Sequence, residues 1–209
     1  MADRREVYEG RDFEQTFQGL LFPLIRRVVA QDPSVSSILS IGFRYAYDLN
    51  VLSKEYPDMK VSGVDLPIWI HRMNEEFPHI EMHQGYALDL LQDGRIGGDV
   101  ATMISTACCF KPKELDAYMT ALSRQSKYVI LNELVDHLPN GRLPNTARLT
   151  RSIPNIYAGA YPGLPPHFAH NYKAAAERAG FKVLHHRLYM PEWTDVYRIE
   201  MVAKAPEDG

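Results

Sequence analysis

Short apolar runs alternate with stretches of helical spacing along most of this chain of 209 residues. Seven runs are bounded by turn-forming or charged residues, which is typical of buried strands. They lie at 35–41, 60–64, 80–83, 99–105, 127–131, 182–188 and 196–202. Apolar positions three and four residues apart predict helices at 47–56, 67–77 and 112–124. Because strand and helix alternate, the strands before residue 132 should be parallel and joined by right-handed crossovers.

The two ends of the chain add further elements. Residues 13–30 have the spacing of an amphipathic helix, with a kink or break expected at Pro23. A helix over 168–179 should end at Gly180, since glycine readily adopts the left-handed conformation that closes helices. The last two strands are joined by a short connection, so they should be antiparallel.

Residues 132–167 break the pattern, because they are rich in proline and show little periodicity. A long irregular segment in a compact domain is usually functional or mobile. We therefore expect one α/β domain over residues 1–209, a Rossmann-like, mostly parallel seven-stranded sheet with helices on both faces and an antiparallel last strand. A helical cap would cover 1–34, and the insertion at 132–167 would lie over the active site.

Composition narrows the class of protein. Hydrophobic residues make up 45% and charged residues 23% of the chain, which are globular values. The net charge of -3 gives no sign of the basic face that nucleic-acid binding requires. Apolar runs fall far short of a membrane span, no signal core follows the N-terminus, and adjacent Cys108 and Cys109 suit a reducing compartment. We expect a cytoplasmic protein, with a homodimer left open.

The ends of the first two strands carry the candidate binding chemistry. In open parallel sheets, ligands bind outside the carboxyl ends of the strands. Gly42 follows the first strand and permits a tight turn, while Asp65 ends the second strand. A carboxylate at a strand tip can accept hydrogen bonds from a ribose diol, and it can equally cap the helix that begins near Pro67. Both roles are compatible with the sequence.

Five stretches together resemble class I S-adenosylmethionine-dependent methyltransferases. They are Ile38–Gly42, Val61–Asp65, His83–Ala87, Gly98–Ile104 and the closing antiparallel strand pair. This resemblance covers nearly all of the chain from residue 35 onward and implies S-adenosylmethionine as cofactor. It also implies a site made of the glycine-loop residues Gly42, Phe43, Arg44, Tyr45 and Ala46 around the methionine part, Asp65 at the ribose, Leu66, Tyr86 and Ala87 near the adenine, and Ser105 and Thr106 on the methyl-transfer side.

The glycine loop departs from the pattern of that family, which is acidic-x-Gly-x-Gly-x-Gly. Ser40 stands at the acidic position, and Arg44 and Ala46 stand at the second and third glycines. Arg44 could pair with the carboxylate of the cofactor, with a phosphate of another ligand, or with solvent. Tyr86 stands where the family often has an acid, and it could stack on the adenine instead.

A hydroxyl acceptor benefits from a base, and histidine suits proton abstraction near neutral pH. His137 is the first candidate and His170 the second, although a loop histidine has an ordinary polar role as well. Glu133, Asp136 and His137 could hold Mg²⁺ or Ca²⁺, but the family's metal-binding acid after the fourth strand is missing, so we expect no metal site. Aromatic residues of the insertion could roof an acceptor pocket or simply pack as a lid.

The first hypothesis is therefore an S-adenosylmethionine-dependent methyltransferase that acts on a small-molecule acceptor, with O-methylation favoured over N-methylation. A relative that binds a ligand or a protein without methylating it is the alternative, and the altered glycine loop supports it. A nucleotide-dependent oxidoreductase is disfavoured, because the residues after Gly42 do not match the dinucleotide fingerprint.

Overall fold

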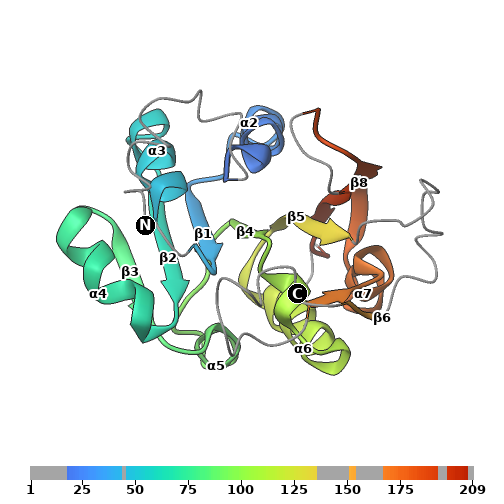
Figure 1. The fold of residues 1–209 in the computed structure, drawn as a ribbon. Helices are drawn as coiled ribbons and strands as arrows, with labels where there is room; N and C mark the ends of the chain where they lie inside the picture. Colours follow the sequence, from blue (N-terminus) through green and yellow to red (C-terminus); the bar gives the residue numbers. More distant parts are fainter. Residues whose placement is uncertain (1–17, 44–45, 136–150, 154–166, 193–196, 207–209) are drawn as a thin grey trace.

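The computed structural model describes residues 18–43, 46–135, 151–153, 167–192 and 197–206. A seven-stranded sheet forms its centre, with the strand order β3-β2-β1-β4-β5-β9-β8 (Figure 1). The strands are β1 (Ser37–Ile41), β2 (Lys60–Asp65), β3 (Glu81–Gln84), β4 (Val100–Ile104), β5 (Tyr128–Val135), β8 (Lys182–Tyr189) and β9 (Tyr197–Lys204). The chain order reverses between β1 and β4, where two crossovers leave in opposite directions.

Pairing within the sheet confirms the predicted topology. The first five strands are parallel, and β9 pairs antiparallel with both β5 and β8. The predicted Rossmann-like sheet with an antiparallel last strand is therefore correct. Parallel strands buried on both faces need continuous apolar sequence, and four of the five residues of β1 and all five of β4 are buried.

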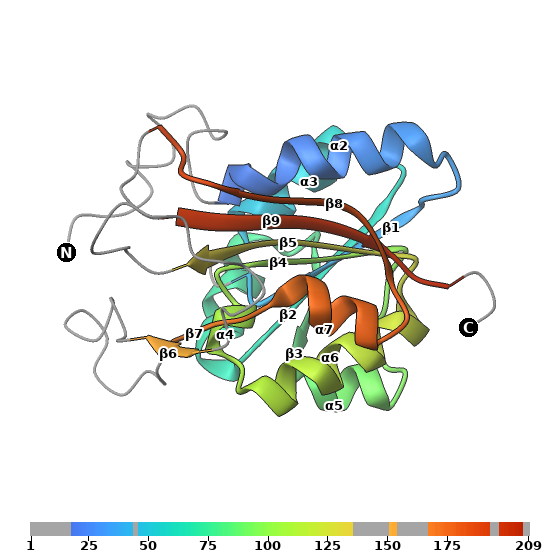
Figure 2. The ribbon, with the colours of Figure 1, turned by 90° about the vertical axis from the view of Figure 1, so that its right-hand side faces the viewer.

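Helices cover both faces of the sheet (Figure 2). Apolar side chains of α2 (Phe22–Gln31), α3 (Tyr47–Glu55) and α4 (Pro67–Glu76) form one buried cluster with the sheet. Those of α5 (Ala87–Gln92), α6 (Pro112–Gln125) and α7 (Tyr172–Arg178) form the other. Ile38 belongs to the first cluster and its neighbour Leu39 to the second, since successive side chains of a strand point to opposite faces.

The break expected at Pro23 is present, because the 3₁₀ turn η2 (Gln18–Leu21) ends where α2 begins and proline fits the first turn of a helix. Other predicted elements need correction. The segment 87–92 is a short helix that the spacing did not reveal. Gly180 follows the end of α7, as predicted, with φ of 88°. Helix α7 begins at Tyr172 and not at 168, because the side chain of Asn171 caps it by accepting the amide hydrogen of Ala174 at 3.0 Å.

The predicted irregular insertion at 132–167 contains regular structure at both of its ends. Strand β5 continues to Val135, and β6 (Arg151–Ile153) pairs antiparallel with β7 (His167–Ala169). Residues 136–150 and 154–166 lie outside the described residues, as do 1–17 of the predicted cap. In Figure 2, β6 and β7 lie on the same side of the molecule as the carboxyl end of β5. Within the described part, no helix is both long and apolar enough to cross a membrane.

Candidate functional site

The predicted site residues follow the carboxyl ends of adjacent strands. Gly42 follows β1, Asp65 ends β2, Tyr86 follows β3 and Ser105 follows β4. Because β1 to β4 are parallel neighbours, their carboxyl ends lie at one edge of the sheet. The structure therefore brings these four positions to a common edge, while Arg44 and Tyr45 lie outside the described residues.

Left-handed backbone marks this edge. Ala46 and Ser105 have φ of 52° and 50°, and they are the non-glycine residues of the described chain with positive φ. Each such residue costs on the order of 1 kcal/mol or more, and this kind of strain clusters at ligand sites. Gly42 also has a positive φ, of 74°, as the tight turn after β1 predicts.

The Thr106 side chain connects the residues that follow β1 and β4. Its hydroxyl Oγ1 lies 3.3 Å from the carbonyl oxygen of Gly42 and 3.1 Å from that of Ile104. A Cβ atom at Gly42 would stand 2.4 Å from the same hydroxyl oxygen, which is too close for two non-bonded atoms. Glycine is therefore required at position 42 by both conformation and space.

Three predicted cofactor residues point into the core. Phe43 and Ala46 belong to the buried cluster beneath α2, α3 and α4, and Ala87 belongs to the opposite cluster. The Phe43 ring covers Gly63, where an added Cβ would lie 2.5 Å from Phe43 Cδ1. These three residues can therefore present only backbone to a ligand.

Exposed apolar side chains flank Asp65. Leu66 is 50% exposed and Tyr86 is 39% exposed, although both are large and apolar. Asp65 Oδ1 accepts the amide hydrogen of Leu66 at 2.7 Å, and Leu66 occupies the N-cap position of α4. Exposed apolar groups beside a carboxylate at a strand end are typical of a binding crevice.

Tyr86 has firm support on one side. Its ring meets the edge of Tyr118 with centroids 6.1 Å apart, and Tyr118 stacks on Phe110 at 4.1 Å. The buried Tyr118 hydroxyl accepts the amide hydrogen of Leu88 at 3.2 Å, which fixes the ring. The partly exposed Tyr86 therefore rests on a rigid aromatic stack and can offer a surface to a planar ligand.

Asp48 is a buried acid of this edge that the sequence analysis did not single out. It lies in the first turn of α3 and is only 3% exposed, and Ser40 Oγ donates to its Oδ2 at 3.2 Å. Burial raises the pKa of Asp48 to about 6, and the negative charge of Asp65 adds to the rise. Acids are common at the starts of helices, so the burial of Asp48 could not be foreseen from the sequence.

Glu133 organises the segment after β4. Its carboxylate accepts the amide hydrogens of Thr106 at 3.1 Å, Ala107 at 2.9 Å and Cys108 at 3.2 Å, at the start of the turn η3 (Ala107–Cys109). Burial raises the pKa of Glu133, and the three amides and Arg198 only partly oppose that rise. Its oxygens are thus engaged by backbone, and not directed to the metal site considered above.

The remaining members of that metal group, Asp136 and His137, lie outside the described residues, so the role of His137 as a base stays a prediction. No cluster of three or more histidine, cysteine or acidic residues in the described part of the chain could hold a metal ion. Cys108 and Cys109 are not joined by a disulfide, as their adjacency predicts.

His170, the second candidate base, has a defined partner. Its Nε2 lies 2.9 Å from the carbonyl oxygen of Phe110, so this nitrogen must carry a hydrogen. The ring is buried and stacks on Phe168 at 5.7 Å, and burial lowers the pKa of His170. Through these contacts His170 connects the end of η3 to the residues before α7. Its catalytic role stays a prediction.

Arg198 was missed because it reads as an ordinary polar position in a strand. It is completely buried, donates from Nη2 to Ser105 Oγ at 2.9 Å and to the carbonyl oxygen of Asn132 at 2.6 Å, and also bonds Asn132 Oδ1 through Nε. Asn132 Nδ2 in turn donates to the Tyr189 hydroxyl at 2.7 Å. Because β9 also contains Glu200 and Lys204, the arginine at position 198 does not stand out in the sequence.

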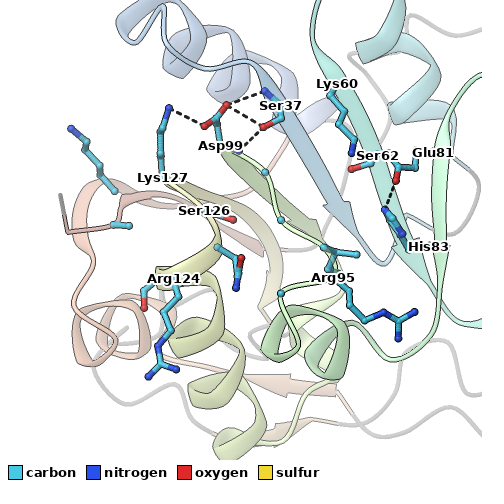
Figure 3. A pocket seen from close by; sticks show the side chains of 18 of the residues that line it. Ser37, Lys60, Ser62, Glu81, His83, Arg95, Asp99, Arg124, Ser126 and Lys127 are labelled. Atoms are coloured by element: carbon cyan, nitrogen blue, oxygen red, sulfur yellow. Dashed lines mark hydrogen bonds and ion pairs between the residues drawn. The ribbon is translucent and has the colours of Figure 1, made fainter. Parts of the chain in front are cut away.

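A groove of about 710 Å³ lies at the opposite edge of the sheet, among the amino ends of the strands (Figure 3). There Asp99 accepts the amide hydrogen of Ser36 at 2.8 Å and pairs with Lys127 at 2.9 Å. Although burial opposes ionisation, Lys127 and the neighbouring serine donors lower the pKa of Asp99 to about 2. These contacts secure the strand starts, whereas ligands of open sheets bind at the carboxyl edge.

No protein-family model matches the chain, and no curated protein matches it by sequence. Solved structures do match it. The N-terminal domain of EvdMO1, with S-adenosylhomocysteine (SAH) bound, is 15% identical with a TM-score of 0.64, over 92% of this chain and 82% of that one. Streptomyces venezuelae DesVI is 15% identical with a TM-score of 0.66, over 99% and 100% of the two chains. An O-methyltransferase family protein from Burkholderia thailandensis is 12% identical with a TM-score of 0.61, over 94% of this chain and 59% of that one.

Proposed function

We propose that this chain, which has the fold of class I S-adenosylmethionine-dependent methyltransferases, transfers a methyl group from S-adenosylmethionine to an oxygen atom of a small molecule. One observation carries the choice of cofactor. Exposed Leu66 and Tyr86 flank the carboxylate of Asp65 at the ends of adjacent strands. Apolar surface beside an acceptor at this edge suits an adenine joined to a ribose diol.

Other residues of the crevice fit the same ligand. The left-handed turn at Gly42 brings backbone to the end of β1, where the amino-acid part of the cofactor would lie. Ser105 and Thr106, after the neighbouring strand β4, would border the reacting end. Tyr86, backed by Tyr118, would give the adenine an aromatic neighbour in place of the family's acid.

S-adenosylmethionine supplies an electrophilic methyl group, so this chain need only place an acceptor in line and exclude water. An oxygen acceptor gains from a base, for which His137 and His170 are the candidates. The similarity to an O-methyltransferase family protein supports oxygen over nitrogen. The strained Ser105 would sit where the acceptor approaches, and Glu133 and Arg198 hold the segment that carries it.

Calorimetric titration with S-adenosylmethionine, SAH and NAD tests this function. We expect roughly micromolar dissociation constants for the first two ligands and no heat with NAD. Turnover with a panel of hydroxyl-bearing and amine-bearing small molecules would then identify the acceptor. Binding of neither S-adenosylmethionine nor SAH would contradict the proposal. It would favour a protein of the same fold that binds a different partner, as the altered glycine loop allows.

A further inference from the structure

Two hydroxyl groups lie at the carboxyl edge of the sheet, beyond the crevice around Asp65. Ser105 is the first residue after β4, and Tyr189 is the last residue of β8. Because β5 and β8 both pair antiparallel with β9, they run in the same direction, so Tyr189 lies at the same edge as Ser105. Both side chains are partly exposed. These hydroxyls can therefore meet a ligand that approaches this edge.

Buried Arg198 connects the two hydroxyl groups. Its Nη2 donates to Ser105 Oγ at 2.9 Å, and its Nε donates to Asn132 Oδ1. Asn132 Nδ2 donates in turn to the Tyr189 hydroxyl oxygen at 2.7 Å. An arginine side chain has only donors, so Asn132 must turn its carbonyl oxygen to Arg198 and its amide nitrogen to Tyr189. The arginine thus fixes the direction of each of these hydrogen bonds.

The hydroxyl hydrogens of Ser105 and Tyr189 are consequently left for another partner. Each hydroxyl oxygen accepts a hydrogen bond from this network, so each hydroxyl can still donate its own hydrogen. Among the residues that the structure describes, neither hydroxyl donates to a protein acceptor. The edge therefore presents two donors, which are held by the completely buried side chains of Asn132 and Arg198.

Donors arranged in this way select for a particular ligand group. Groups that are held in place before binding lose little conformational freedom when a ligand arrives. Two hydroxyl donors suit a ligand oxygen that has lone pairs and no hydrogen, which describes the oxygens of carbonyl and carboxylate groups. Burying an arginine is costly, and such a network is explained if it fixes the direction of the donors.

We propose that the Ser105 and Tyr189 hydroxyls bind a carbonyl or carboxylate oxygen of the methyl acceptor. Asn132 and Arg198 position these two donors. This inference rests on the proposed function, in which the acceptor approaches Ser105 after β4. The bound oxygen would then stand beside the hydroxyl that is methylated. The acceptor class is therefore a hydroxy acid or a hydroxy ketone, and not a simple alcohol or phenol.

Matched pairs of acceptors test this assignment. Salicylate and o-cresol differ only in the carboxylate or methyl group beside the phenol hydroxyl, and lactate and isopropanol are the aliphatic equivalent. The pair o-hydroxyacetophenone and o-ethylphenol makes the same comparison for a neutral carbonyl. Formation of SAH from S-adenosylmethionine reports turnover of each compound. In at least one pair, we expect the wild type to favour the carboxylate or carbonyl compound by about tenfold or more in kcat/KM.

Tyr189→Phe removes one donor and keeps the ring. It should lower this preference by about threefold or more, through a higher KM for the favoured compound, and leave SAH affinity unchanged. Ser105→Ala removes the other donor and should act in the same direction. Tyr128→Phe is the matched control, because the Tyr128 hydroxyl bonds Asp32 at the amino edge, at 3.0 Å. It should keep the full preference.

Asn132→Asp tests the positioning role. An aspartate can still accept from Arg198, but it cannot donate to Tyr189, so the Tyr189 hydroxyl must turn its hydrogen to the new carboxylate. The variant should lose the preference as Tyr189→Phe does, although its tyrosine hydroxyl is intact. A merely structural role would leave the preference unchanged. Thermal unfolding of each variant reports whether the fold is kept.

Three results would overturn this inference and leave the cofactor assignment standing. They are equal turnover of both members of every pair, an undiminished preference in Tyr189→Phe or Asn132→Asp, and no turnover of any of these compounds by a wild type that binds SAH. A wild type that binds neither S-adenosylmethionine nor SAH would overturn the proposed function and this inference together.

Discussion

Arg198 and Ser105 are joined by a hydrogen bond of 2.9 Å between Nη2 and Oγ, which links the last strand of the sheet to the left-handed residue after β4. The two residues are 93 positions apart in the sequence. The bond links the conformation of Ser105, at the carboxyl edge of the sheet, to a side chain that no ligand can touch, because Arg198 is fully buried.

Replacing Arg198 by methionine should destabilise the protein by about 3–5 kcal/mol, the range for removing one partner of a buried charged network. The change leaves Glu133 without its nearby cation and Asn132 without a donor. Urea unfolding measures the loss. The exposed Arg124→Met is the control and should stay within about 0.5 kcal/mol of the wild type. A similar small effect in both variants would show that the Arg198 network does not stabilise the fold.

Asp65→Ala should weaken binding of SAH by about 1.5–3 kcal/mol, the range for losing a charged hydrogen-bond acceptor. Isothermal calorimetry with the wild type alongside measures this change. Asp89→Asn, an exposed acid on α5, should have no effect. Unchanged SAH affinity in Asp65→Ala would refute the ribose assignment.

Gly42→Ala should destabilise the protein by about 2 kcal/mol or more, since the new Cβ meets Thr106 and the backbone has φ of 74°. Adding Thr106→Ala removes the hydroxyl and methyl groups closest to the new atom. The double variant should therefore recover part of the loss, leaving about 1 kcal/mol of backbone strain. Chemical denaturation of the two single variants and the double variant completes the cycle. Strict additivity would show that the two side chains do not collide.

Asp48 should make the stability of the protein depend on pH. Its pKa is about 6 in the folded protein, above its ordinary value, so the folded state binds the proton more tightly than the unfolded state. The contribution of this group is therefore complete below pH ~4 and is lost as the pH rises through 6, by about 2–3 kcal/mol. Relative to the wild type, Asp48→Asn should gain free energy of unfolding over this interval and level off above it. A difference that stays constant from pH 4 to 8 would mean that Asp48 titrates normally.

His170→Gln should keep the hydrogen bond to the Phe110 carbonyl, because the glutamine amide can donate where Nε2 does. If His170 only positions the η3 segment, this variant should retain most turnover, while His170→Ala should lose about 1–3 kcal/mol of stability. Loss of turnover in His170→Gln with an unchanged unfolding midpoint would instead support a role for His170 as the catalytic base.

The centre of the sheet could be predicted from the sequence because β1 and β4 are largely apolar and buried, and because Gly42 and Asp65 mark the ends of β1 and β2. The same reasoning missed α5, since six residues are too few to show helical spacing. It also assigned Phe168 to a helix, because a three-residue strand such as β7 depends on pairing with β6, which local sequence does not encode.

Some residues of the candidate site could likewise be predicted from the sequence, and others could not. Asp65 and Gly42 could be found because each ends a recognisable strand. Asp48 and Arg198 could not, because their roles depend on burial and on partners brought close only by the fold. Arg198 meets Asn132 across 66 positions, and no local pattern specifies that contact.

The position of β9 has a consequence for synthesis of the chain. This strand lies between β5 and β8, although it follows both in the sequence. A nascent chain that has emerged only as far as residue 196 would have unpaired backbone along both neighbours, and the sheet would be split in two. Pairing of β8 with the rest of the sheet must therefore wait for residues 197–204. A chain interrupted before them would expose the edges of β5 and β8 to other molecules.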